Sequence, residues 1–375
     1  MLPFHRIFFS GRLEKRCDIT LSLFDQCTIR RSKCLVFLSF RTTQRFTRIS
    51  GLVDTTNWQA THIEDDKASP NALLASSSIR IRTINTLTNQ TTILFGSDQS
   101  GFHTYRHTDA EFRRITGFRQ VDNVSILVVD SENHCIRLLN RTNGTTNPIA
   151  GRCTSAGFRD GNGTNSAFKL PHFIIDGKYK NEYYITDTDN NAIRTYDHST
   201  GGVGTLVKKH HAIVQPKELV LNKNRTLIFV TVKDGIAKIN ITSGDTLLYE
   251  NFQKETHGIT RLPHTDYLLV TEYGSTVTMI TELGEHVLIV CYQTNHRRCQ
   301  IRGITSIQFL QQLNALAISS NNGLKRLDLS FKQGGKIEQL LALTVESIIR
   351  VEYEQTIWDN EGICQEYKIS ATIEI

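Results

Sequence analysis

The sequence predicts an all-β fold, namely a six-bladed β-propeller built from four-stranded blades. The first observation is a repeat: an Ile-Arg pair recurs at Ile81-Arg82, Ile136-Arg137 and Ile193-Arg194, with spacings of 55 and 57 residues. The second is local, because short β-branched or aromatic runs alternate with Gly, Asn and Asp clusters and no stretch keeps a helical period. Repeats of this length with four strands each are typical of a propeller, which hides its sheet edges by closing radially.

The repeat units can be placed in order along the chain. In the third unit, the runs "FIID", "EYYITD", "AIRTYD" and "GVGTLV" are the four expected strands. The later units are shorter but keep the same order of runs and turns. We expect six four-stranded units near residues 58–96, 115–151, 171–207, 216–250, 256–290 and 301–344.

The two ends of the chain fall outside these units. We expect an N-terminal extension without an assigned fold at 1–43, the propeller at 44–355 and a short tail at 356–375. The segment "RFTRISG" at 45–51 resembles the outer strands "TTILFG" and "TNPIAG", so it is one candidate for the strand that closes the ring. The segment "VESIIRVEYEQTIWDN" at 345–360 is the other, and the sequence does not rank the two.

Further landmarks relate the first two units to each other. A glycine follows the Arg of the Ile-Arg pair by 14 residues, as Gly96 and Gly151. A Gly-Phe pair comes next, and another Phe follows that Gly by 11 residues, as Phe112 and Phe168. Landmarks aligned at near-constant spacing indicate a duplicated structural unit.

The second and third units share the octet D-x-x-N-x-x-I-R. Asp and Asn side chains satisfy backbone N–H groups in turns and tolerate left-handed conformations, so both are expected in a turn between strands. The Ile is expected in the core between blades, while the Arg reaches solvent or pairs with an Asp. Consecutive octets lie on separate blades, so we interpret them as scaffold rather than as a chemical site. The residues are Asp130, Asn133, Ile136 and Arg137, and Asp187, Asn190, Ile193 and Arg194.

The octet, the following G-F-x-D-G at 157–161 and the run "FKLPHFIID" resemble the NHL repeat, whose name comes from an Asn-His-Leu at the octet's position. Here Asn133 and His134 are present and Cys135 replaces the Leu. The resemblance is strong over 115–207, fair over 58–112 and weak over 216–344, and Ala75 and Ser78 replace the Asp and Asn in the first unit. It implies a six-bladed propeller that binds a partner, similar to extracellular NHL-type propellers of invertebrate animals.

The chain has eight cysteines, and two of them flank an Asn-Gly turn. Cys135 opens one expected strand and Cys153 follows the next, so they are expected to face each other at about 4.5–5.5 Å between Cα atoms. That distance suits a disulfide, and two reduced buried thiols are the alternative.

A second pair, Cys291 and Cys299, flanks the polar loop "YQTNHRR" and could close it in the same way. Zinc ligation by cysteine is not expected, because no C-x-x-C occurs. The remaining cysteines are unassigned: Cys17, Cys27, Cys34 and Cys364.

Seven N-x-S/T sequons make the chain a candidate glycoprotein. Together with the paired cysteines they favour an extracellular or cell-surface location. The first residues have no continuous apolar run typical of a signal peptide, and no apolar run is long enough for a membrane span. The sequons start at Asn89, Asn123, Asn140, Asn143, Asn162, Asn224 and Asn240.

Function in a propeller is expected at the rim where the innermost strands begin around the central channel. Aligning the units puts a basic or imidazole side chain at five of six equivalent rim positions, with no carboxylate. Such a rim suits an anionic ligand, for example an acidic peptide, a glycan or a phosphate group. The aligned residues are His62, Thr116, His172, Lys217, His257 and Arg302.

The sequence therefore favours a non-enzymatic binding module for a protein or glycan ligand, with no cofactor. The main alternative is a zinc-dependent lyase or hydrolase, because His62, His172 and His257 come from alternate units and three imidazoles can bind one zinc ion. Such a site is similar to the three-histidine zinc site of peptidyl-glycine amidating lyases. A third possibility is an intracellular propeller that binds RNA or protein. The net charge of +6 is only mildly basic and the Lys and Arg residues form no dense block, so nucleic acid is not an expected partner.

Overall fold

The computed structural model describes residues 49–51, 58–252, 255–263, 265, 267–272, 276–281, 286–291, 304–313, 315–320, 323–328, 349–353 and 369–373. The chain divides into two compact units, Phe46–Ser330 and a second one made of Met1–Arg45 and Phe331–Ile375. In the second unit, β26 (Ile349–Tyr353) pairs with β27 (Ile369–Ile373) as an antiparallel ribbon. Among the described residues, no helix is long and apolar enough to cross a membrane.

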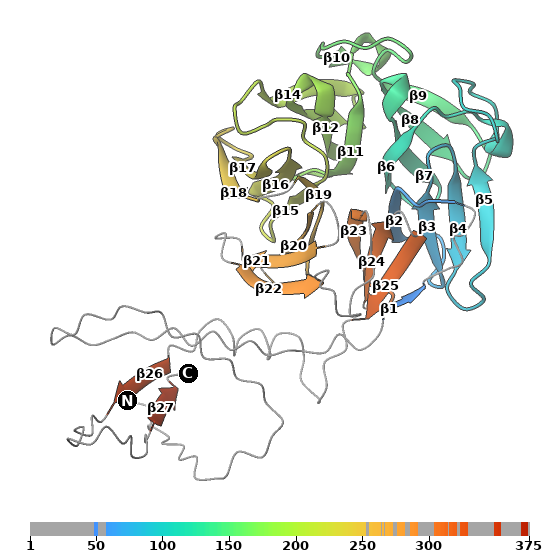
Figure 1. Cartoon of the computed structure of the whole chain (residues 1–375). Coiled ribbons are helices and arrows are strands. Elements are labelled where there is room, and N and C mark those ends of the chain that lie inside the picture. Colours follow the sequence, from blue (N-terminus) through green and yellow to red (C-terminus); the bar gives the residue numbers. More distant parts are fainter. Residues whose placement is uncertain are drawn as a thin grey trace, which may run out of the picture. The chain divides into compact units, whose positions relative to one another are not determined.

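The larger unit is all β, and its first three sheets follow one another along the chain (Figure 1). The first contains β2 (His62–Asp65), β3 (Ala72–Ser76), β4 (Ile81–Asn85) and β5 (Thr91–Phe95). The second contains β6 (Ile115–Gln120), β7 (Ser125–Asp130), β8 (Cys135–Asn140) and β9 (Thr146–Ala150). The third contains β11 (Pro171–Asp176), β12 (Glu182–Asp187), β13 (Ala192–Asp197), β14 (Gly202–Lys208) and the short β10 (Gly161–Asn162).

The other three sheets of the larger unit continue this order. The fourth contains β15 (Leu219–Leu221), β16 (Leu227–Val232), β17 (Gly235–Asn240) and β18 (Thr246–Asn251). The fifth contains β19 (Thr256–Arg261), β20 (Tyr267–Glu272), β21 (Thr276–Thr281) and β22 (His286–Cys291). The last contains β23 (Ile304–Leu310), β24 (Ala315–Ser320), β25 (Gly323–Asp328) and β1 (Ile49–Gly51).

Short 3-10 helices occur in the connections between these strands. Two of them, η2 (Ser131–Asn133) and η4 (Thr188–Asn190), form the octet turns. The other two lie in the longer connections that lead into the second and third sheets, as η1 (His107–Asp109) and η3 (Gly163–Asn165).

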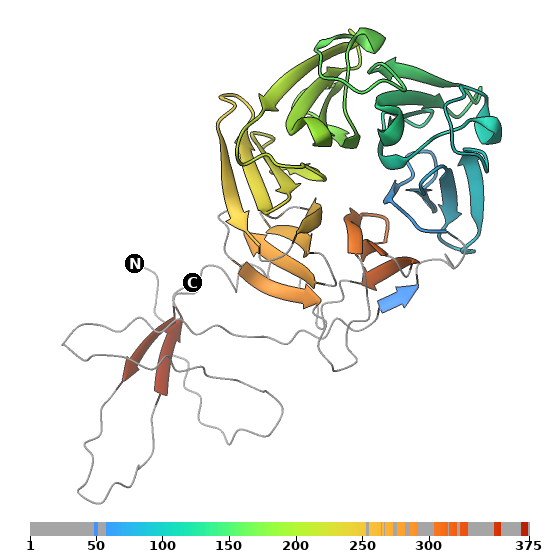
Figure 2. The same cartoon turned by 45° about the horizontal axis from the view of Figure 1, so that its top comes forward.

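The sheets of the larger unit are arranged as the blades of a β-propeller (Figure 2). Each innermost strand contacts the next in the order β2, β6, β11, β15, β19 and β23, and β23 returns to β2. The prediction of six four-stranded blades was wrong in one respect, because the described strands form five four-stranded blades and one five-stranded blade. The extra strand arises because β10, in the loop that enters the third blade, pairs with the outer strand β14.

The ring is closed by the N-terminal strand β1. Ile49, Ser50 and Gly51 pair in antiparallel register with Leu327, Arg326 and Lys325 of β25. β1 therefore supplies the outer strand of the last blade, as one of the two sequence candidates predicted. The competing segment contributes β26, which pairs with β27 and not with a blade.

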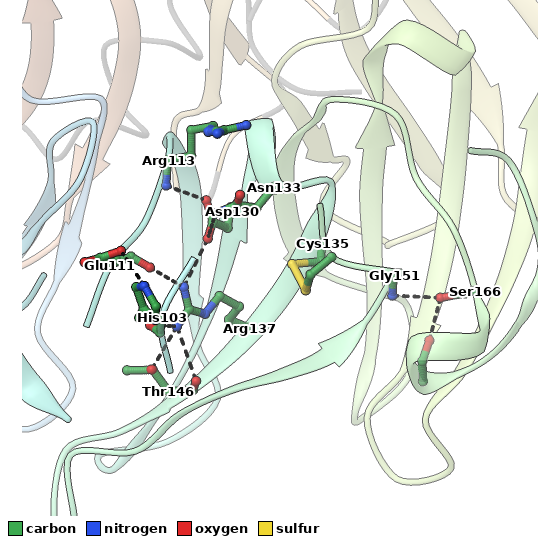
Figure 3. Close-up of a disulfide and its surroundings, with 12 residues drawn as sticks. His103, Glu111, Arg113, Asp130, Asn133, Cys135, Arg137, Thr146, Gly151 and Ser166 are labelled. Carbon is green, nitrogen blue, oxygen red and sulfur yellow. Dashed lines mark hydrogen bonds and ion pairs between the residues drawn. A yellow bond between two sulfur atoms is a disulfide. The ribbon is translucent and has the colours of Figure 1, made fainter. Parts of the chain in front are cut away.

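The octet arginine of the second blade holds the connection that enters that blade (Figure 3). The Arg137 guanidinium is fully buried and donates to Asp130 Oδ2 at 3.2 Å, Glu111 O at 2.6 Å and His103 O at 2.9 Å. Asn133 Nδ2 donates to Gly101 O and to Asp130 Oδ2, both at 2.8 Å. Side chains of the octet thus replace the strand partners that this irregular backbone lacks.

The third blade repeats these contacts with the equivalent residues. Arg194 donates to Asp187 Oδ2 at 2.7 Å, Ala167 O at 3.0 Å and Arg159 O at 3.0 Å. Asn190 Nδ2 donates to Gly157 O at 2.8 Å. Each octet therefore fastens the preceding Gly-Phe connection to its own blade, which explains why the octet and the Gly-Phe landmarks recur together.

The hydrophobic core lies between adjacent blades. Ile136 belongs to a cluster shared by the second and third blades, and Ile193 to one shared by the third and fourth. On the innermost strands, one apolar side chain per blade occupies an equivalent position and is at most 1% exposed: Ile63, Phe118, Ile174, Leu219, Ile259 and Ile307. This apolar ring gives a reference level along the channel.

Cys135 and Cys153 form a disulfide, with Cα atoms 5.0 Å apart (Figure 3). The pairing was predicted, but the predicted strand register was wrong. Ile136 pairs with Ala150 after a bulge, so Cys153 lies beyond the end of β9. The disulfide instead joins β8 to the segment after β9, where Thr154 N donates to Asn133 O at 2.7 Å. The predicted Cys291–Cys299 pair and the four unassigned cysteines lie outside the residues whose side chains are described.

Candidate functional site

The strand register places the predicted rim residues at two different levels of the channel. In the second blade Val129 pairs with both Gly117 and Ile136, and in the first blade Ser76 pairs with both His62 and Ile81. Since Ile81 corresponds to Ile136 in the repeat, His62 corresponds to Gly117 rather than to Thr116. The sequence alignment of the first blade was therefore wrong by one residue, and Thr61 occupies the rim position there.

The sixth rim residue was also assigned wrongly. In the last blade Ser319 pairs with Ser306 and Leu324, so Ser306 corresponds to Gly117 and Thr305 occupies the rim position. Arg302 lies outside the described residues. The short match between "HGIT" at 257–260 and "RGIT" at 302–305 misled the alignment, because the strand register places Thr305, three residues after Arg302, at the rim level.

His62 lies inside the ring and faces aromatic side chains. Its imidazole is 1% exposed and packs edge-on against Phe118 and Phe173, with ring centroids 4.9 Å away in each case. Its Nε2 lies 3.5 Å from Glu64 Oε1. In the described part of the chain no three His, Cys, Asp or Glu side chains form a group that could hold a metal ion. The arrangement of His62, His172 and His257 that the zinc hypothesis required is thus not formed.

The rim level is partly neutralised by a carboxylate that the sequence alignment did not include. Lys217 Nζ lies 2.5 Å from Glu255 Oε1 and 3.2 Å from His257 Nε2. Burial lowers the pKa of His172 to about 3, and the positive charges of Lys217 and Arg114 act in the same direction. His172 is therefore neutral at physiological pH, and this end of the channel is less positive than the sequence predicted.

The next level fills the channel with side chains. Its six positions hold three large and three small residues, namely His62, Gly117, Phe173, Glu218, Gly258 and Ser306. A Cβ atom on Gly117 would lie 2.9 Å from the Phe173 ring, and one on Gly258 would lie 2.8 Å from Ile307 N. Glycine at these positions lets neighbouring side chains cross the channel. Phe173 and Glu218 are 2% and 1% exposed, so this level separates the two ends of the channel.

Glu218 is a buried acid without a cationic partner at hydrogen-bond distance among the described residues. Ile259 N donates to Glu218 Oε2 at 3.2 Å. Burial raises the pKa of this carboxyl to about 8, and the contact with Ile259 N opposes the shift only in part. Glu218 is therefore largely protonated at neutral pH.

A cavity of about 280 Å³ lies beyond this level, toward the carboxyl ends of the innermost strands. All six innermost strands or the turns that follow them contribute to its lining. The residues one step past the apolar ring form its wall, as Glu64, Arg119, Ile175, Val220, Thr260 and Gln308. His62 and Phe173 lie at its inner end. The cavity therefore lies at the opposite end of the channel from the predicted rim.

Three charged residues from three blades are joined along the cavity wall. Arg119 lies between two carboxylates, with one guanidinium nitrogen 2.7 Å from Glu64 Oε1 and the other 2.5 Å from Asp176 Oδ2. Burial would raise the pKa of Glu64, but Arg119 and His62 together lower it to about 2. The same attraction raises the pKa of Arg119 above its usual range. With one guanidinium and two carboxylates, this wall of the cavity is acidic.

The opposite wall of the cavity is basic. Lys223 and Arg225 belong to the turn between β15 and β16, and Arg261 ends β19. Asn222 Oδ1 fixes that turn by accepting from Thr226 N at 2.8 Å. Lys223, Arg225 and Arg261 form no ion pair with any described carboxylate. The sequence pointed to the opposite end of the channel, although a hydrophilic residue one position past the buried apolar residue in four of the six innermost strands, as in "IED" and "FRQ", was a usable signal.

Comparison with solved structures supports the fold. A gluconolactonase from Xanthomonas campestris aligns with a TM-score of 0.54 and 12% identity, over 76% of this chain and 90% of that chain. A streptogramin B lyase aligns with a TM-score of 0.52 and 13% identity, over 76% and 98% of the two chains. A catalytically inactive virginiamycin B lyase from Staphylococcus aureus, solved with quinupristin, aligns with a TM-score of 0.52 and 14% identity, over 76% of this chain and 99% of that chain.

The fold is a β-propeller. At identities of 12% to 14% the likeness shows the architecture alone and assigns no activity to this propeller. No protein-family model matches the chain, and no curated protein matches its sequence.

Proposed function

We propose that this protein is an extracellular binding module of the NHL type, and that it binds an anionic ligand in the cavity at the carboxyl ends of its innermost strands. Counting the five-stranded sheet as one blade makes the proposed propeller six-bladed. The observation that carries the proposal is the cavity wall formed by Lys223, Arg225 and Arg261, whose charges no described carboxylate neutralises. Clefts with one sign of charge attract a ligand of the opposite sign.

The proposed extracellular location rests on the disulfide and on the exposure of the sequons. Disulfides persist mainly in oxidising compartments. Five of the seven sequon asparagines are exposed, as Asn89, Asn123, Asn143, Asn162 and Asn224. The other two, Asn140 and Asn240, are half-buried, and the side-chain oxygen of each accepts two backbone N–H groups of its turn. Glycosylation is therefore expected only at members of the exposed set, which mass spectrometry after enzymatic deglycosylation would check.

Anion binding is tested with two labelled probes, a hexaglutamate peptide and a heparin tetrasaccharide, followed by fluorescence anisotropy. At least one probe should bind with an affinity that falls as salt rises. The double variant Lys223→Ala/Arg225→Ala should weaken that binding by about tenfold or more, because two direct charge contacts are lost. Lys180→Ala is the matched control, since Lys180 is exposed in the corresponding β11–β12 turn but does not line the cavity.

The proposal fails if neither probe binds, or if the double variant and the control bind equally well. In the second case the mildly basic surface as a whole would account for binding, and the cavity would have no part in it. A thermal melt of each variant shows whether a loss of binding reflects unfolding. The turn that carries Lys223 and Arg225 is exposed, so we expect these melts to coincide.

A further inference from the structure

The two walls of the cavity differ in chemistry, and this difference narrows the ligand class. The inference rests on the proposed function, because it concerns the same cavity. On the basic wall, Arg261 donates to Thr265 O at 3.3 Å, but its buried Nε has no hydrogen-bond partner among the residues that the structure describes. Lys223 and Arg225 are exposed at the mouth. A single anionic group of a ligand could therefore contact three cationic side chains from two adjacent blades.

The acidic wall has spare hydrogen-bond acceptors. Each carboxylate of Glu64 and Asp176 offers about four lone-pair positions, and Arg119 occupies only part of that capacity. Gln120 Nε2 adds one contact to Glu64 Oε2 at 3.3 Å. The side chain of Asp176 is 34% exposed, so its free positions are accessible from the cavity. This wall suits hydrogen-bond donors without a charge, such as hydroxyl groups, and repels a second anionic group.

Apolar side chains lie between these walls. Ile175 and Val220 occupy adjacent wall positions, and Phe173 lies at the inner end. A ring with an apolar C–H face could pack against them while its polar edges reach both walls. The volume of about 280 Å³ is below the common range for drug-sized ligands, so it suits one small cyclic group rather than an extended chain.

We infer that the cavity binds a single acidic sugar residue, such as a terminal uronic acid of a glycan. Its carboxylate would contact Lys223, Arg225 and Arg261, its hydroxyl groups would donate to Glu64 and Asp176, and its C–H face would pack on Ile175 and Val220. An acidic peptide fits less well, because it lacks the hydroxyl donors and would bring further carboxylates toward Glu64 and Asp176.

The experiment compares three probes by saturation-transfer NMR and calorimetry at millimolar concentration. Methyl β-glucuronide carries both the carboxylate and the hydroxyls, methyl β-glucoside carries only the hydroxyls, and acetylated triglutamate amide carries only carboxylates. The glucuronide should bind at least tenfold more tightly than either of the others. Both Lys223→Ala/Arg225→Ala and Asp176→Asn should weaken its binding about tenfold, while Lys180→Ala and Asp234→Asn should not.

The outcomes separate this inference from the proposed function. If the peptide binds as tightly as the glucuronide, depends on Lys223 and Arg225 and ignores Asp176→Asn, the acidic-sugar inference is overturned and anion binding stands. If no anionic probe binds, the acidic-sugar inference and the proposed anion-binding function are both overturned. If the glucoside binds as tightly as the glucuronide, the basic wall has no role and both fall as well. Thermal melts of Asp176→Asn exclude unfolding, and Asp176→Glu, which keeps the charge, should retain part of the binding.

Discussion

The third and fourth blades use the same backbone position in different ways. Ile193 and Ile236 occupy equivalent places, and the next residue is Arg194 in the third blade and Ala237 in the fourth. Arg194 hydrogen-bonds to carbonyl oxygens of the connection that enters its blade. In the fourth blade the equivalent connection is short, and its Ile213 is fully buried in a cluster that includes Ala237.

The difference teaches that an incoming connection can be held either by a buried ion pair or by apolar contacts. A long connection with free carbonyl groups requires hydrogen-bond donors, because unpaired backbone groups are costly when buried. A short connection that buries an isoleucine requires only room for that side chain. The small side chain of Ala237 leaves room for Ile213. The ion-pair solution produces a recognisable motif in the sequence, whereas the apolar solution does not.

The largest effect is expected from removing an octet arginine. Arg137→Ala leaves the carboxylate of Asp130 buried without its cation, leaves Glu111 O without a donor and removes one of the two donors to His103 O. We expect a loss of about 3–5 kcal/mol in the free energy of unfolding, measured by urea denaturation. Arg152→Ala, at an exposed arginine of the same blade, should change it little. A loss below about 1 kcal/mol would show that the octet does not hold the connection.

The apolar solution is tested by Ile213→Ala. Deleting this fully buried side chain should lower the free energy of unfolding by about 3 kcal/mol, through lost burial and a cavity between the third and fourth blades. The control is Leu247→Ala, since Leu247 is 51% exposed on the outer strand of the fourth blade. If both substitutions have equal effects, the fourth-blade connection is not held by apolar packing and the contrast between the blades fails.

The disulfide adds a third fastening, which in the described part of the chain occurs in the second blade alone. Replacing both Cys135 and Cys153 with serine removes a covalent loop with a sequence separation of 18 residues. Loop-closure entropy predicts a loss of about 2–3 kcal/mol in the free energy of unfolding. Reduction of the unmodified protein should give a similar shift in the urea midpoint. An unchanged midpoint in both experiments would mean that the octet holds this blade without help.

The smallest effect is the pH dependence of stability that the buried acid Glu218 causes. Glu218, in the fourth blade, has a folded-state pKa of about 8 against 4.5 for an unperturbed glutamate. Between these values the folded state holds more protons than the unfolded state, so stability falls as pH rises from about 5 to 8 and levels off above 8. The slope should not exceed about 1.4 kcal/mol per pH unit for this single group.

Glu218→Gln removes that proton uptake, so the variant should gain stability relative to the unsubstituted protein as pH rises. Urea denaturation at intervals between pH 5 and 9 measures the difference. Asp234→Asn, at an exposed acid of the same blade, should run parallel to the unsubstituted protein. Parallel curves for Glu218→Gln would instead show that Glu218 is already ionised in the folded state.

The sequence was sufficient to predict the strand order of the second and third blades, where a buried ion pair holds the incoming connection. The octets and the Gly-Phe landmarks recur because they contact each other, so their spacing carried both the repeat length and the blade order. It was insufficient for the channel. Ile81 follows its pairing partner Ser76 by five residues, whereas Ile136 follows the equivalent residue Val129 by seven. In addition, β6 contains a bulge after Ile115, so equal spacing in the sequence did not mean equal height in the ring.

The charged group of Glu64, Arg119 and Asp176 shows why the candidate site was missed. Its members come from three different blades, and each follows an apolar residue in a strand that is otherwise unremarkable in sequence. Only the register through the hairpins brings Glu64 and Arg119 to one level and puts Asp176 one residue further along its strand. The strand β10 was missed for a similar reason, since it is two residues long and pairs with the outer strand of a blade whose four main strands were correctly predicted.

The pairing of β1 with β25 has a consequence for protein synthesis. The two strands are separated by about 270 residues, so at ~5–20 residues per second the ribosome adds the partner roughly 15–55 s after β1 has been made. During that interval the completed blades form an open arc with two unpaired ends, and such edges readily bind other chains. Chaperone contact with nascent chains should therefore be most frequent just before β25 emerges and should fall sharply once it can pair.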